Sequence, residues 1–105
     1  MGDTILDYLG EGEILCQLAE EAAELGKAAL KYRRACGYTR NVTPATKGDA
    51  YKNLLEEVAD VMVCLSVLGL DSGVAAIEVR RTTEQKLARW YKRLNDSIGK
   101  PRVKP

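Results

Sequence analysis

Histidine is absent from this chain of 105 residues, which excludes imidazole metal ligands and catalysis by a histidine acid or base. The three cysteines, Cys16, Cys36 and Cys64, include no CxxC pair, so neither a disulfide framework nor a thiolate metal site is predicted. The sequence also lacks the basic, apolar leader of a secreted protein and any uninterrupted run of transmembrane length. We therefore expect a protein of the reducing cytoplasm that does not enter the membrane.

Net charge is nearly absent as well, because sixteen lysines and arginines face fifteen aspartates and glutamates. This balance argues against a nucleic-acid polymer or a membrane surface as the partner. The charges are nevertheless separated along the chain. Residues 1–30 hold seven acids and one base, net −6, whereas residues 78–105 hold three acids and nine bases, net +6. An acidic and a basic segment are thus available to face one ligand, or each other.

Proline is scarce and stands only at Pro44, Pro101 and Pro105, so almost the whole chain is free to be helical. Apolar residues recur at helical spacing and predict an all-α fold. The predicted helices are a short one over 3–9 and long ones over 13–35, 47–68 and 74–95. We expect a single domain over 1–99 and a flexible tail over 100–105.

Glycines and loop residues punctuate these helices. Gly10 and Gly12 are expected to break or bend the chain, and Gly37 to end the first long helix. Residues 37–46 and 69–73 have the composition of loops. The first two long helices should therefore form a hairpin, with the last helix following a turn.

The segment 58–70, VADVMVCLSVLGL, is apolar on nearly every side of its helix. Such a helix is normally buried all round, and a chain this short supplies few neighbours to bury it. We therefore expect a homodimer or homotetramer with a four-helix-bundle-type core. In the last helix, the apolar residues expected to face inward are Ile77, Leu87, Trp90 and Leu94.

Two acidic motifs are the most distinctive feature of the sequence: EEAAE at 20–24 and EEVAD at 56–60. Positions three apart share a helix face, so Glu21 pairs with Glu24 and Glu57 with Asp60. Antiparallel packing of the two helices would bring both pairs together. Converging carboxylates in a partly buried site are unfavourable unless a cation neutralises them. An all-oxygen donor set favours Mg²⁺ first and Mn²⁺ second.

Magnesium commonly shares its coordination with phosphates, so a polyphosphate ligand is expected. The bases that could neutralise it lie on the last helix: Lys86, Arg89, Lys92 and Arg93. Three further candidates for ligand contacts are Gln17 and Asn53, each one turn before an acidic motif, and Lys31. Each feature also has a structural interpretation: the acids and bases as solvated faces, the amides as surface residues, and Lys31 as a complement to the helix dipole.

Several stretches together resemble the MazG-like nucleoside triphosphate pyrophosphohydrolases of the all-α NTP pyrophosphatase superfamily. They are ILCQLAEEAAELGKAALKYRRA, NLLEEVADVMVCL and KLARWYKRL, with the TP of the intervening loop, and they span roughly residues 13–94. The family signature, EExxE followed by ExxD, appears as Glu20, Glu21 and Glu24, then Glu57 and Asp60. The basic segment departs from family forms with Lys-Asn and Arg-Tyr, since Leu87 follows Lys86 and Trp90 follows Arg89.

This resemblance implies a homo-oligomeric helical bundle that binds Mg²⁺ through Glu21, Glu24, Glu57 and Asp60. It implies hydrolysis of an NTP or dNTP to the monophosphate and pyrophosphate. Glu20 or Glu56 would accept the proton or support the metal ligands, and the sequence does not choose between them. Base preference, sugar preference and the number of metals also stay open.

Two other functions compete with this interpretation. A di-iron carboxylate bundle also presents facing glutamates, but such sites use Glu-x-x-His, which a chain without histidine cannot supply. A non-catalytic oligomerisation or regulatory module would need only the apolar seam and not the acids. Pyrophosphate release from nucleotides separates this module from the enzyme.

Overall fold

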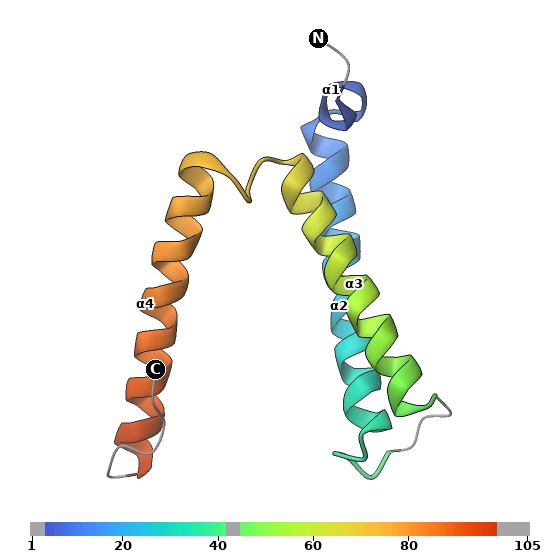
Figure 1. Ribbon diagram of the computed structural model, residues 1–105, viewed down its shortest axis with the longest axis vertical. Coiled ribbons are helices and arrows are strands. Elements are labelled where there is room, and N and C mark those ends of the chain that lie inside the picture. The colour runs from blue at the N-terminus through green and yellow to red at the C-terminus, as the bar shows by residue number, and fades with distance from the viewer. Residues whose placement is uncertain (1–3, 42–44, 99–105) are drawn as a thin grey trace. The chain divides into compact units, whose positions relative to one another are not determined.

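The computed structural model describes residues 4–41 and 45–98, and every regular element in them is a helix (Figure 1). The four helices are α1 (Ile5–Leu9), α2 (Glu11–Ala35), α3 (Lys47–Val67) and α4 (Gly73–Ile98). The predicted all-α fold is confirmed. The predicted flexible tail, 100–105, lies outside the described residues.

Local signals explain where the long helices begin and end. Gly10 has a φ of 88°, a left-handed value that glycine tolerates, and α2 begins at the next residue. Gly12 lies inside α2, so the break predicted there is wrong, since one glycine costs a helix only about 1 kcal/mol. Gly37, with a φ of 78°, follows the end of α2 as predicted. The Thr46 hydroxyl caps α3 by accepting from the Asp49 amide at 3.1 Å.

The chain divides into two compact units, residues 1–69 and 70–105. In the first unit, α2 and α3 lie side by side and run in opposite directions, and α1 contacts α2 (Figure 1). In the second unit, α4 is the one helix among the described residues. The hairpin of α2 and α3 is therefore the element that positions the candidate site.

The hairpin has a narrow core. Its buried residues are Ile14 and Ala28 from α2 with Ala50 and Cys64 from α3. On each helix the two buried residues are fourteen positions apart, which is two seven-residue repeats and keeps one face of each helix toward the other. The rings of Tyr32 and Tyr51 pack near the linking loop, with centroids 5.4 Å apart and planes tilted by 50°.

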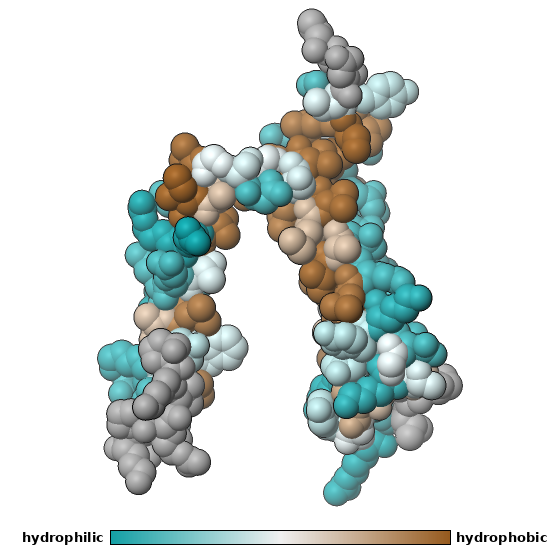
Figure 2. Space-filling model, in the orientation of Figure 1, coloured by the Kyte–Doolittle hydropathy of each residue, from teal (hydrophilic) through white to brown (hydrophobic). Residues whose placement is uncertain are grey.

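Much apolar surface lies outside this core. In the segment predicted to be buried all round, Met62 is 60% exposed and Val63 is 58% exposed, because α2 covers only one side of α3. In Figure 2 the apolar side chains of the hairpin gather along one edge and the hydrophilic ones along the other. Burial of this segment by helices of other copies of the chain therefore stays a prediction.

The apolar side of α4 has no partner within its own unit. Ile77, Leu87, Trp90 and Leu94 are exposed there, since that unit offers no second helix among the described residues, so their inward packing stays a prediction. Cys16 is exposed on α2, whereas Cys64 is buried in the hairpin. Among residues 4–41 and 45–98, no helix combines the length and the apolarity needed to cross a membrane.

Candidate functional site

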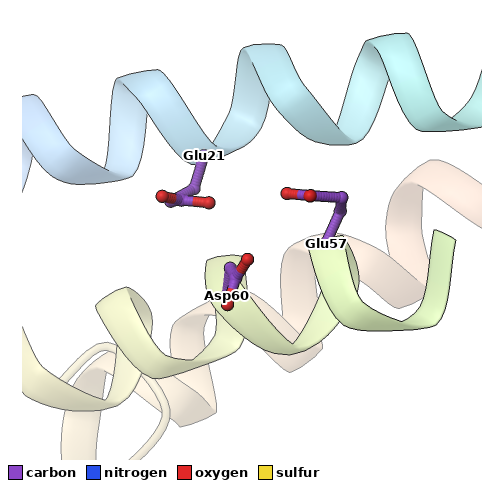
Figure 3. Close-up of side chains that lie close together, drawn as sticks. All are labelled: Glu21, Glu57 and Asp60. Atoms are coloured by element: carbon purple, nitrogen blue, oxygen red, sulfur yellow. The ribbon is translucent and has the colours of Figure 1, made fainter. Parts of the chain in front are cut away.

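Three carboxylates from the two acidic motifs meet between the helices of the hairpin. Glu21 of α2 points toward Glu57 and Asp60 of α3, and one oxygen from each lies within 4.8 Å of the others (Figure 3). Three of the four predicted metal ligands are thus brought together. We call these three residues the acidic cluster.

The position of the cluster follows from the same seven-residue spacing that forms the core. Glu21 stands midway between the buried Ile14 and Ala28, and Glu57 stands midway between the buried Ala50 and Cys64. Each glutamate therefore occupies a core position of its helix and is half-buried there. An apolar residue would be normal at these places, so the acids are an exception to the packing pattern.

Glu57 is the member of the cluster with the least favourable surroundings. Its Oε2 atom is shielded from solvent and has no hydrogen-bond partner in the structure. Partial burial raises the pKa of this carboxyl above its ordinary value, and the nearby charges of Asp60, Glu21, Glu24 and Glu56 raise the pKa further. Among the described residues, no base forms an ion pair with Glu21, Glu57 or Asp60.

One amide supports the cluster from the preceding turn of α2. The Gln17 side chain donates from Nε2 to Oε1 of Glu21 at 2.7 Å. This bond orients the Glu21 carboxylate from within its own helix. Gln17, predicted as a ligand contact or a surface amide, is thus placed against a cluster acid.

Glu24, the fourth predicted ligand, does not join the cluster. Its Oε1 lies 3.5 Å from Nζ of Lys27 in an exposed ion pair. Such pairs contribute about 0–1 kcal/mol, so little free energy holds Glu24 in that arrangement. It remains one turn from Glu21 on the same helix.

A pocket of about 440 Å³ opens beside the cluster on the hairpin. It is lined by Glu24, Lys27, Ala28, Lys31, Arg34, Asn53 and Glu57. Lys31 and Asn53, both predicted as ligand contacts, therefore share one cavity with two of the predicted metal ligands. The sequence analysis did not single out Lys27 or Arg34, although positions 27, 31 and 34 follow the spacing of one helix face.

The remaining predicted residues lie outside this cluster and pocket. Glu20 and Glu56 are exposed on α2 and α3, so their burial does not choose between them as the proton acceptor. Lys86 and Arg89 are exposed on α4, in the second unit. The arrangement on the hairpin can thus hold a cation at one end and an anion nearby.

The donor set of the cluster fits a hard divalent ion. It offers carboxylate oxygens only, from two helices, and includes the shielded and unpartnered oxygen of Glu57. Comparison of the chain with protein-family models, with curated proteins and with solved structures found no match. Functional assignment therefore rests on the residues themselves.

Proposed function

We propose that this chain is a Mg²⁺-dependent, MazG-like nucleoside triphosphate pyrophosphohydrolase. It would hydrolyse an NTP or dNTP to the corresponding monophosphate and pyrophosphate. The observation that supports this proposal best is the meeting of Glu21, Glu57 and Asp60, contributed by both acidic motifs, at core positions of a hairpin. A structural protein would gain stability from apolar residues at those positions.

The proposed ligands of Mg²⁺, or of Mn²⁺ in its place, are the three cluster residues and Glu24. Glu24 would have to exchange its exposed ion pair with Lys27 for the metal, at a cost of about 1 kcal/mol or less. When bound, the metal would neutralise phosphate charge and lower the pKa of the attacking water. Gln17 would keep Glu21 oriented through its 2.7 Å hydrogen bond.

The other residues of the proposed site bind the substrate or move a proton. Glu20 and Glu56 both remain candidates for the proton acceptor, and each stands directly before a cluster glutamate. Lys31 and Asn53 line the pocket and would contact the ligand there. Lys86 and Arg89 of α4 are proposed phosphate contacts as well, because their charge is complementary to the ligand.

Assembly and location complete the proposal. One stripe of α3, made of Leu55, Val58 and Met62, is exposed and apolar at helical spacing. We propose that a second copy covers it in a homodimer or homotetramer of the cytoplasm.

The direct test is pyrophosphate release from a panel of NTPs and dNTPs with Mg²⁺. We expect release with at least one nucleotide, its loss in Glu57→Gln, and its retention in Glu84→Gln, which removes an exposed acid of α4. Absence of pyrophosphate with every nucleotide would favour the non-catalytic module. If Glu57→Gln released pyrophosphate as fast as Glu84→Gln, the acidic cluster would have no role in the reaction.

A further inference from the structure

The pocket beside the acidic cluster carries positive charge that the metal centre does not use. Lys27 is paired with Glu24, but no acidic side chain among the described residues pairs with Lys31 or Arg34. Both bases nevertheless line the same cavity of about 440 Å³ as Glu57. This volume lies within the range of small-molecule sites.

The two helices arrange the pocket with an acidic end and a basic end. Along α2, Glu24, Lys31 and Arg34 follow one another toward the C-terminal end of the helix. Because α3 runs in the opposite direction, Asn53 stands one turn from Glu57 toward that same end. A bound ligand that extends from the acidic cluster toward this end of the hairpin would thus pass Asn53 and reach Lys31 and Arg34.

We propose that Lys31 and Arg34 form a phosphate-binding subsite, so that the phosphate chain of the substrate runs from the acidic cluster toward the C-terminal end of α2. This inference rests on the proposed function and deepens it by giving the direction of the bound polyphosphate. One phosphate is held at the metal centre and the next lies between the Arg34 guanidinium and the Lys31 ammonium.

The subsite predicts which ligands are selected. A ligand with two or more linked phosphates reaches both ends of the pocket, whereas orthophosphate reaches only one. The expected order of affinity in the presence of Mg²⁺ is therefore a diphosphate well above a monophosphate. The competing explanation is that these bases only complement the α2 dipole. Arg33 decides between them, because it stands at the same helix end, is exposed, and does not line the pocket.

The test uses methylenediphosphonate, a diphosphate analogue that is not hydrolysed at its bridge, and orthophosphate as the comparison. Binding to the full chain is measured by calorimetry with Mg²⁺ for the wild type, Lys31→Met, Arg34→Met and Arg33→Met. Methionine keeps an apolar stem and good helix propensity, and circular dichroism checks that each variant is folded. We expect Lys31→Met and Arg34→Met each to weaken methylenediphosphonate binding about tenfold, with Arg33→Met within twofold of the wild type.

Mn²⁺ binding, followed by electron paramagnetic resonance in the same samples, separates this inference from the proposed function. Wild type that binds Mn²⁺ but not methylenediphosphonate would overturn the subsite and leave the metal centre standing. Equal losses in all three variants, or no loss in any, would also overturn the subsite. The expected pattern without hydrolysis of any nucleotide would support the subsite while the proposed reaction fails.

Discussion

Glu57 is the residue whose proposed role in binding a cation conflicts most with the stability of the fold. Its carboxylate occupies a core position between Ala50 and Cys64, and its Oε2 is shielded without a hydrogen-bond partner. Burial and the neighbouring acids raise the pKa of Glu57, so its charged form destabilises the metal-free fold. Binding of a cation would reverse that effect.

Replacement of Glu57 by glutamine should therefore stabilise the metal-free protein at neutral pH. A carboxyl with a raised pKa contributes its full stability below its ordinary value of 4.5 and loses it as the pH rises through the raised pKa. Thermal melts in a chelator should show a higher Tm for Glu57→Gln than for wild type at pH 7, and a smaller difference at pH 4. A lower Tm at pH 7 would contradict this account.

Added Mg²⁺ should reverse the order of the two proteins. A ligand that binds only the native state at a hundred times its Kd adds about 2.7 kcal/mol to the free energy of unfolding. Wild type should gain this stabilisation and Glu57→Gln should not. The difference between melts with Mg²⁺ and with chelator measures the effect directly.

Two adjacent glutamates provide a matched test of the metal centre. Glu21 belongs to the acidic cluster, whereas Glu20 is exposed on another side of α2. Glu21→Gln should weaken Mn²⁺ binding by about tenfold or more, and Glu20→Gln should leave Mn²⁺ binding unchanged. Equal effects would show that the charge of the helix matters and the cluster geometry does not. A Glu20→Gln variant that binds Mn²⁺ without turnover would identify Glu20 as the proton acceptor.

Side-chain detail was predictable only where helical spacing determines it. Glu57 and Asp60 are three residues apart and therefore share one face of α3. Glu21 lies on the facing side of α2, and the antiparallel packing brings it to them. The partner of Glu24 was not predictable, because Glu21 and Lys27 both stand three residues from it and an exposed side chain can rotate toward either.

The hairpin of α2 and α3 is held by small residues as much as by large ones. Ala28 and Ala50 are 2% and 1% exposed, the lowest values in its core. Small side chains on facing helices let the backbones approach closely, which would suit the proposed binding of one ion by carboxylates from both helices. The core is therefore sensitive to added volume at these positions.

An enlarged side chain at Ala50 should separate the two helices. Ala50→Leu is expected to lower the free energy of unfolding by about 1–3 kcal/mol, because the core has no room for three more carbon atoms. Urea denaturation followed by circular dichroism measures this loss. The control is Ala59→Leu, an exposed position of the same helix, which should change stability by less than about 0.5 kcal/mol.

The bounds of the helices were predicted to within a few residues because strong local signals mark them. Gly10, Gly37 and the Thr46 cap act through backbone geometry and adjacent hydrogen bonds, which the sequence displays directly. Gly12 shows the limit of this reasoning. A glycine in the first turn of a long helix stays helical because packing stabilises the turns that follow.

The described residues of the hairpin leave much apolar surface uncovered outside its core. The stripe of Leu55, Val58 and Met62 runs along α3. The sequence predicted that the segment 58–70 needs several neighbours, and it could not say which chain supplies them. Association depends on matching surfaces of two molecules, and the periodicity of one chain does not describe such a match.

A charge placed in the stripe should therefore act on assembly. Met62→Glu is expected to shift the protein from dimer or tetramer to monomer, with a Tm that no longer rises with protein concentration. Analytical ultracentrifugation measures the mass of wild type, Met62→Glu and the control Ala59→Glu, which puts the same charge outside the stripe. A wild type that stays monomeric at high concentration would contradict the proposed assembly.

The acidic cluster draws its members from two antiparallel helices, so its geometry depends on how α2 and α3 are aligned along their axes. A slip of α3 past α2 by one helical turn moves every facing residue by about 5.4 Å and would part Glu21 from Glu57. The facing alanines Ala28 and Ala50 offer no bulky side chains to prevent such sliding. A bound cation would then select one register from several, because it would stabilise the one in which Glu21 and Glu57 meet.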